Sequence, residues 1–220
     1  MEKIFEAVVF DMDGVIFDSE RAVMECWMAL ADKYDIPDLK LHYFDCIGVN
    51  TAKSREIMKA AYGEEFPYDT YAKEASEMFH TKYSDNKLPM KPGVRELLDF
   101  LKVRKKKIAL ASSTRRKTVL KLLQAAGILE YFDAVVCGDM VTRSKPDPDI
   151  FLKACEEIGV KPDEAYAIED SYNGIRAAHA GGLHPIMVPD LLPGNDKMKK
   201  LAEVILKDLL EVKDYCEKQI

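Results

Sequence analysis

Residues 6–20 read EAVVFDMDGVIFDSE, an apolar run that leads directly into acidic side chains. The run at 7–10 is short and uninterrupted, which is typical of a strand buried on both faces. Asp11, Asp13 and Asp18 follow it. Carboxylates repel one another and are costly to remove from water, so three of them beside a buried strand indicate a functional site.

The composition is that of a globular chain from a reducing compartment. Of 220 residues, 48% are hydrophobic and 32% charged, and the net charge of −6 argues against nucleic acid or anionic membrane as the main partner. The five cysteines are widely spaced, which favours free thiols over a disulfide framework or a zinc site. No apolar run suits a signal peptide or a membrane span. We expect a cytoplasmic monomer.

Short apolar segments alternate with helical patterns along the rest of the chain. Further candidate strands are 108–111, 134–137, 165–168, 185–188 and, less clearly, 203–206. Between them, stretches such as PGVRELLDFLKVRKKK place apolar residues at helical spacing. This alternation predicts an α/β fold, with a parallel sheet covered by helices on both faces.

Residues 19–87 break the alternation. They show several helical patterns and no convincing strand, and about 70 residues is long for a loop. We therefore predict an inserted α-helical domain at 19–87, within a core formed by residues 1–18 and 88–220. The flanking stretches GVIFDSE and SDNKLPMKPG are the expected hinges.

Polar residues follow several of the candidate strands. In open α/β sheets ligands bind beyond the carboxyl ends of the strands, so these residues are candidates for one site. They are Asp11 and Asp13 after the first strand, Ser112 and Ser113 after the second, Lys145 in SKPDPDIF, and Glu169 with Asp170 after the fourth. Although they span most of the chain, they are expected at one edge of the sheet.

Each of these residues also has a simpler interpretation. The Asp-Gly sequence favours turns, Ser112 could be a helix N-cap, and Lys145 could be a solvated surface lysine. Glu169 and Asp170 could stabilise the start of the next helix. Because that role needs one acid, a bound cation explains the adjacent pair better.

Taken together, the side chains match the needs of phosphoryl transfer. A carboxylate can attack phosphorus to form an aspartyl-phosphate, while Mg²⁺ and a lysine offset the repulsion between anions. A second acid can protonate the leaving oxygen. A serine hydroxyl and helix-start amides can hold the phosphoryl oxygens.

Four stretches, FDMDGVIFDSE, ALASST, SKPDPDIF and IEDSYNGIRAAHAGG, resemble the four motifs of the haloacid dehalogenase (HAD) superfamily, in the right order. The resemblance covers nearly the whole chain and is greatest to the β-phosphoglucomutase-like phosphatases. It implies a three-layer, Rossmann-like parallel-sheet core with an inserted α-helical cap. The cap would close over the substrate and select the leaving group.

The resemblance assigns roles to the residues that match its motifs. Asp11 would be the nucleophile and Asp13 the general acid/base. Ser112, Ser113 and Lys145 would bind the transferring phosphoryl group.

It also implies a Mg²⁺ site. The ligands would be the carboxylates of Asp11 and Asp170 and the backbone carbonyl of Asp13. Glu169 would be a direct or water-mediated ligand, and Asn173 would orient the site.

Comparison with other members of the superfamily favours a phosphatase. Dehalogenases of this superfamily lack an acid at the position of Asp13. The mutases have a histidine and an arginine where this chain has Val23 and Thr51. We therefore expect hydrolysis of a small phosphomonoester such as a sugar phosphate. A β-phosphoglucomutase-type phosphomutase is the first alternative, and a catalytically silent ligand-binding protein is the second.

Four residues of the cap are candidates for substrate binding. Arg21 lies in sequence next to the hinge, and Gly48 matches a glycine of the mutase cap. Lys53 and Arg55 follow closely and could take over the binding of an anion, which keeps the mutase alternative open.

Overall fold

The computed structural model describes residues 5–47, 51–83 and 88–219. It divides into two compact units. The core unit comprises Met1–Phe17 and Met90–Ile220, and the helical unit comprises Asp18–Pro89.

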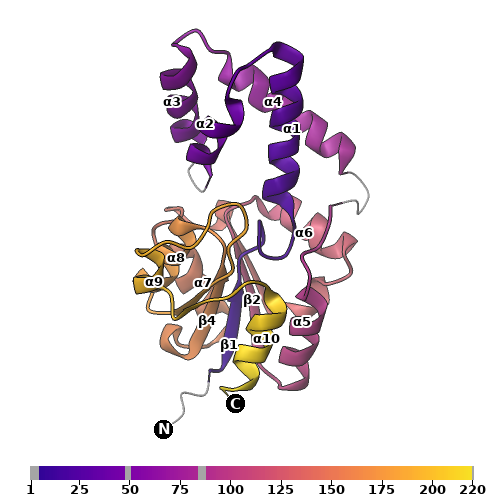
Figure 1. Ribbon diagram of the computed structural model, residues 1–220. Helices are drawn as coiled ribbons and strands as arrows, with labels where there is room; N and C mark the ends of the chain where they lie inside the picture. The colour runs from indigo at the N-terminus through magenta and orange to yellow at the C-terminus, as the bar shows by residue number, and fades with distance from the viewer. Residues whose placement is uncertain (1–4, 48–50, 84–87, 220) are drawn as a thin grey trace. The chain divides into compact units, whose positions relative to one another are not determined.

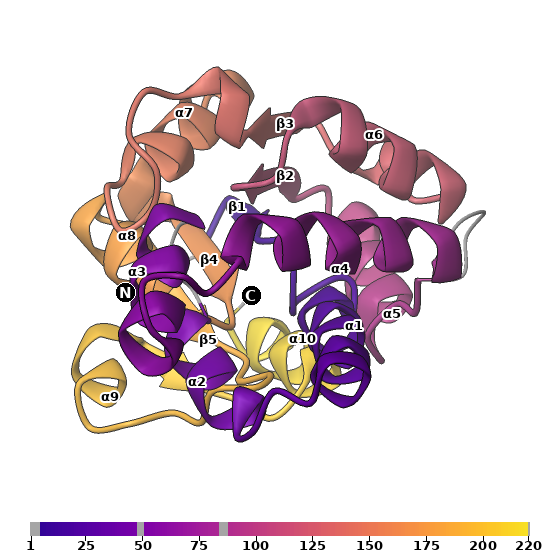
Figure 2. The same ribbon diagram turned by 90° about the horizontal axis from the view of Figure 1, so that it is seen from above.

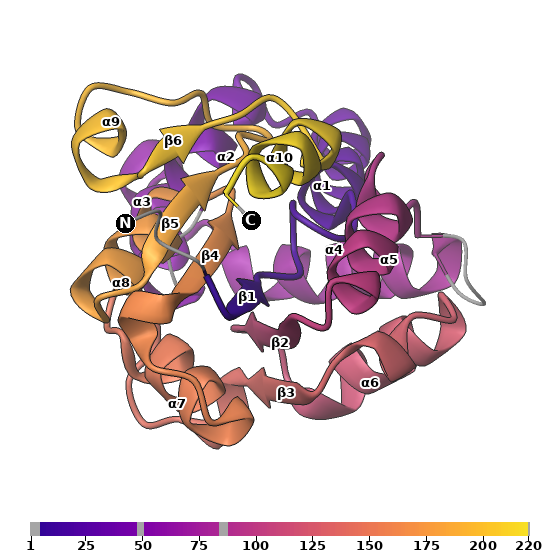
Figure 3. The ribbon, with the colours of Figure 1, turned by 90° about the horizontal axis from the view of Figure 1, so that it is seen from below.

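The core unit contains a six-stranded parallel sheet of order β3-β2-β1-β4-β5-β6 (Figure 3). Its strands are β1 (Ala7–Phe10), β2 (Lys107–Ser112), β3 (Ala134–Cys137), β4 (Ala165–Glu169), β5 (His184–Met187) and β6 (Val204–Ile205). The predicted parallel α/β class is confirmed, and each predicted strand is found with its ends shifted by at most one residue. β1 lies between β2 and β4, where Phe10 is in register with Leu110 and Ile168.

Helices cover both faces of this sheet. They are α5 (Val94–Val103), α6 (Arg116–Ala125), α7 (Asp149–Ile158), α8 (Tyr172–Ala180), α9 (Met198–Leu201) and α10 (Leu209–Glu217), with 3₁₀ turns at Leu129–Tyr131, Gly138–Met140 and Pro162–Glu164. Figure 3 shows α7 and α8 on one side of the sheet and α5 and α10 on the other. The core unit is therefore a three-layer sandwich, whose labelled elements can be followed in Figure 1.

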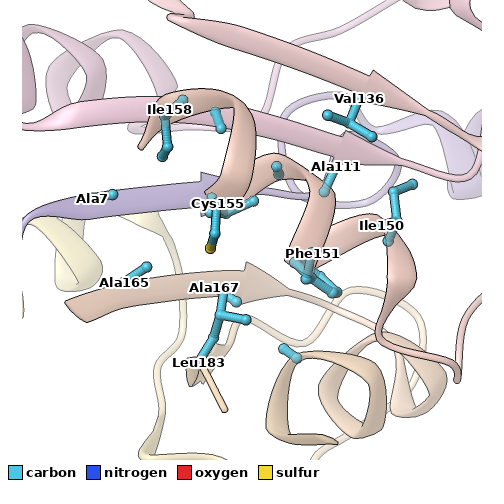
Figure 4. Close-up of a cluster of buried hydrophobic side chains, with 14 of the residues drawn as sticks. Ala7, Ala111, Val136, Ile150, Phe151, Cys155, Ile158, Ala165, Ala167 and Leu183 are labelled. Carbon is cyan, nitrogen blue, oxygen red and sulfur yellow. The ribbon is translucent and has the colours of Figure 1, made fainter. Parts of the chain in front are cut away.

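The face of the sheet toward α7 carries mostly small side chains. Toward α7, small residues such as Ala7, Ala111 and Ala165 pack with Phe151 and Ile158 of that helix (Figure 4). Small residues let helix and sheet approach closely. Because both faces are buried, β1 and β3 are unbroken apolar runs and apolar runs form most of β2 and β4, which is why these strands could be found in the sequence.

The described part of the helical unit is built from helices (Figure 2). These are α1 (Ser19–Tyr34), α2 (Leu39–Cys46), α3 (Thr51–Tyr62) and α4 (Tyr68–Lys82). Trp27 of α1 is buried, with ring centroids 5.7 Å from Tyr68 and 6.5 Å from Tyr43. In the described parts of both units, no helix combines the length and apolar character needed to cross a bilayer.

Candidate active site

Three neighbouring strands carry the polar residues of the site at their carboxyl ends. Asp11 follows β1, Ser112 ends β2, and Glu169 ends β4 with Asp170 directly after it. The Asp11 amide donates to the carbonyl of Ile168 at 2.9 Å, which continues the pairing of β1 with β4. Parallel strands bring their carboxyl ends to one edge, so these side chains meet although their sequence positions are distant.

Asp11, Glu169 and Asp170 form a buried acidic cluster. One carboxylate oxygen from each lies within 4.8 Å of the others, and the residues are 6%, 1% and 6% exposed. The Glu169 carboxylate is held by Ser171, whose amide and hydroxyl both donate to Oε2 at 3.0 Å. Three negative charges out of water need positive charge nearby.

Lys145 supplies part of that charge. Its Nζ donates to Asp11 Oδ1 at 2.5 Å, to Glu169 Oε1 at 2.7 Å and to the Ala111 carbonyl at 3.0 Å. These three acceptors match the three donors of an ammonium group. Nζ also lies 4.9 Å from the centroid of the Phe151 ring. Since the side chain is only 8% exposed, Lys145 is not a solvated surface lysine.

Burial and neighbouring charges shift the pKa values of Asp11 and Lys145. Burial raises the pKa of the Asp11 carboxyl well above its usual range, and although Lys145 lowers it, the charges of Glu169 and Asp13 raise it further. Burial alone would lower the pKa of Lys145, but the carboxylates of Asp11 and Glu169 outweigh burial and hold that pKa above its ordinary value. With all three acids ionised, one ammonium leaves excess negative charge in the cluster.

The donor set fits a divalent cation such as Mg²⁺. It consists of carboxylate oxygens, which hard cations prefer, spaced closely enough to share one ion. The turn after β1 lies against it: Gly14 has a φ of +79°, and a Cβ there would come within 2.3 Å of Asp170 Oδ2. Glycine is therefore required where the Asp13–Gly14 turn meets Asp170. Which residues bind a metal stays a prediction.

The structure assigns the helix N-caps to other residues. Ser171, not Glu169 or Asp170, is the N-cap of α8, and its hydroxyl accepts from the Gly174 amide at 3.1 Å. The N-cap of α6 is Arg115, whereas Ser112 is the last residue of β2. Ser112 and Glu169 are thus the last residues of strands, and neither is a helix N-cap.

Asp13 lies outside the acidic cluster and contacts a residue that sequence reasoning did not select. Its Oδ2 accepts a hydrogen bond of 2.8 Å from Thr114 Oγ1. Thr114 follows Ser112 and Ser113 after β2, so its position beyond a strand end was the available signal. Nothing in the spacing indicated Asp13 as its partner.

The other predicted site residues of the core unit differ in burial and in hydrogen bonding. Ser112 is fully buried, and its hydroxyl accepts from the Thr114 amide at 3.1 Å. Ser113 is exposed. Asn173, in the first turn of α8, accepts from Arg176 at 3.0 Å.

The predicted substrate residues of the helical unit make ion pairs within that unit. Arg21 lies 3.4 Å from Asp18, and Lys53 pairs with Glu56 at 2.9 Å. Arg55 makes a bidentate contact with Asp69, with N–O distances of 2.7 and 3.1 Å. Gly48 lies outside the described residues.

A parallel α/β sheet with a lysine-bridged acidic cluster at its carboxyl edge is the arrangement expected of haloacid dehalogenase-type enzymes. Residues 8–188 match the family model described as haloacid dehalogenase-like hydrolase. The chain belongs to this family, as the resemblance of its motifs predicted.

Several relatives are similar over most of the chain. The phosphorylated carbohydrates phosphatase of Thermotoga maritima is 35% identical over 204 residues, which cover 92% of this chain and 94% of that protein. The β-phosphoglucomutase of Bacillus subtilis is 34% identical over 191 residues, 83% of each chain. Among solved structures, CbbY of Rhodobacter sphaeroides in complex with phosphate is 25% identical, with a TM-score of 0.74 and coverage of 95% and 96%.

Proposed function

We propose that the chain is a Mg²⁺-dependent phosphatase that hydrolyses a small phosphomonoester, a sugar phosphate or similar compound, through an aspartyl-phosphate on Asp11. The observation that carries this proposal is the buried Asp11 carboxylate beside the Glu169–Asp170 pair. Its Oδ1 accepts a hydrogen bond from Lys145 Nζ at 2.5 Å. The similarity to a Thermotoga phosphatase named for phosphorylated carbohydrates supports the substrate class.

Binding of the phosphate group follows from the charges of the site. Asp11, Asp170 and the Asp13 carbonyl would hold Mg²⁺, with Glu169 direct or through water, and the ion would offset the repulsion between phosphate and carboxylates. Lys145, whose Nζ donates to Asp11 Oδ1, contributes a second positive charge. The Ser112 hydroxyl and the backbone amides that follow it hold the phosphoryl oxygens.

The reaction then needs two proton transfers. An oxygen of Asp11 attacks phosphorus, the ester P–O bond breaks, and Asp13 gives its proton to the leaving alkoxide. Asp13, now a carboxylate, takes a proton from water as the water oxygen attacks phosphorus. The bond to Asp11 breaks, phosphate leaves, and Asp13 is protonated again.

Phosphomutase chemistry is the second candidate, because the Bacillus subtilis β-phosphoglucomutase is 34% identical. A mutase must grip the second phosphate of a bisphosphate intermediate. Val23 and Thr51 replace the histidine and the arginine of the mutase pattern. Loss of these charge-assisted contacts favours water as the acceptor of the phosphoryl group.

The test is phosphate release from a panel of sugar phosphates, phosphoglycolate-like acids and nucleoside monophosphates, with and without Mg²⁺. We expect Mg²⁺-dependent release by the wild type and none by Asp11→Asn. Conversion of β-glucose 1-phosphate to glucose 6-phosphate after addition of a bisphosphate primer would favour the mutase instead. No release from any ester would favour the silent ligand-binding protein.

We further propose that the enzyme acts in the cytoplasm, as a monomer, on small metabolites. The net charge of −6 disfavours nucleic acid and anionic membranes as partners. All five cysteines are free thiols, as expected in a reducing compartment.

A further inference from the structure

A hydrogen bond between side chains connects the loops after β1 and β2. Thr114 Oγ1 donates to Asp13 Oδ2 at 2.8 Å, and the two residues are 101 positions apart in sequence. Both are half-buried. When Asp13 is ionised, the bond is charge-assisted and stronger than one between neutral groups.

The backbone of Thr114 is held on both sides. Its amide donates to the Ser112 hydroxyl at 3.1 Å, and its carbonyl accepts from the Gly138 amide at 3.2 Å. The approach of Gly138 is close, since a Cβ on it would lie 2.2 Å from the Ser113 carbonyl oxygen. The Thr114 hydroxyl therefore projects from a rigid segment between the end of β2 and the start of α6.

The backbone of Asp13 is also held. The Gly14 amide donates to the Phe17 carbonyl at 2.9 Å, and the Ile16 amide donates to the Met12 carbonyl at 2.9 Å. These bonds close a tight turn around Asp13. With the backbone fixed, the main remaining freedom of this residue is rotation about its side-chain bonds, which moves the carboxyl group.

We propose that Thr114 is a positioning residue that holds the Asp13 carboxyl in the orientation needed for proton transfer; this inference rests on the proposed phosphatase function. A hydroxyl can donate to a carboxylate and accept from a protonated carboxyl, so the contact can persist in both protonation states of Asp13. Orientation of the acid/base is a condition for efficient proton transfer.

A positioning role predicts a dependence on the leaving group. Alkyl phosphates release a strongly basic alkoxide, which needs the Asp13 proton as the ester bond breaks. Nitrophenyl phosphate releases a weakly basic phenolate, which can leave without that proton. A misplaced Asp13 should therefore slow transfer of the phosphoryl group to Asp11 much more from alkyl esters than from the nitrophenyl ester. The later attack of water is the same for both esters.

The experiment compares Thr114→Val, which removes the hydroxyl, with Thr114→Ser, which keeps it. We expect Thr114→Val to lower kcat/KM, which reports only the steps through phosphorylation of Asp11, by about 10- to 100-fold on an alkyl phosphate and much less on nitrophenyl phosphate. Thr114→Ser should retain most of the activity. Thr118→Val makes the same change at a half-buried position of α6 and should leave both rates unaltered.

A double-mutant cycle tests whether the effect passes through Asp13. Adding Thr114→Val to Asp13→Asn should slow the residual nitrophenyl activity no further. Equal losses of kcat/KM on both esters, an additive effect in the Asp13→Asn background, or no loss at all would overturn the inference. If Thr114→Val does not fold, Thr114→Ala tests the same contact. A wild type inactive on every ester would contradict the proposed function itself.

Discussion

Lys145 determines the charge balance of the site. Its ammonium lies between Asp11 and Glu169 and is almost completely removed from water. Attraction to both carboxylates keeps it protonated, and in return it limits their mutual repulsion. The residue thus has a stabilising role that exists before any substrate binds.

Replacing Lys145 by methionine should destabilise the fold. The variant leaves buried carboxylates without their shared cation, and breaking such pairs costs about 3 to 5 kcal/mol. Urea unfolding in Mg²⁺-free buffer measures the loss, and we expect added Mg²⁺ to recover part of it. Lys161→Met is the matched control, because Lys161 is 76% exposed beside Glu164. Unchanged stability of Lys145→Met would contradict this role.

At the scale of elements, a second ion pair joins parts of the core unit. Lys91 lies where the chain returns to the core unit, and its amide donates to the Ile16 carbonyl at 2.8 Å. Its Nζ lies 2.7 Å from Asp190 Oδ1, in the loop after β5, and the side chains are 19% and 1% exposed. The pair therefore ties the segment after the helical unit to the edge where the site lies.

Lys91→Met should destabilise the core unit by about 3 kcal/mol, because it leaves the Asp190 carboxylate buried without its cation. Combining Lys91→Met with Asp190→Leu should restore most of the loss, since an apolar pair can replace a buried ion pair. Chemical denaturation of the single and double variants measures both effects. The exposed pair Lys199–Asp196 provides the control, and Lys199→Met should change little. If Lys91→Met destabilises the protein no more than Lys199→Met does, the ion pair does not stabilise the core unit as described.

The sequence was informative where local patterns fix the structure. Buried parallel strands are apolar runs, and residues after such strands share an edge, so the proximity of Asp11 and Asp170 could be predicted. The contacts of Thr114 with Asp13 and of Lys91 with Asp190 could not be predicted. They depend on loop paths and rotamers that bring together positions far apart in sequence. The catalytic and metal-binding roles stay predictions.

At the scale of the whole molecule, buried thiols link stability to pH. Burial raises the pKa of Cys137 and of Cys155 to about 11, and that of Cys216 to about 12. A cysteine in the unfolded chain titrates at about pH 8.5. The folded pKa values are higher, so the stability from these neutral thiols is complete below about pH 8.5 and is lost as the pH rises toward about 11.

The free energy of unfolding should therefore fall above about pH 8.5, by about 1.4 kcal/mol per pH unit for each of these thiols. Urea unfolding at increasing pH measures the slope. Cys155→Ala removes one titrating group and should give a shallower slope than the wild type. Tyrosine and lysine also titrate in this range, so the difference between the two slopes is the relevant quantity. Identical slopes would contradict the burial effect.

The central claim is that Asp11 becomes phosphorylated during turnover. The direct measurement is to quench the enzyme in acid during turnover with Mg²⁺ and substrate, reduce acyl phosphates with borohydride and sequence the peptides by mass spectrometry. The account predicts that Asp11 is recovered as homoserine only when both substrate and Mg²⁺ are present, and never in Asp11→Asn. Sustained phosphate release with Asp11 unmodified, or with the label on another residue, would contradict it.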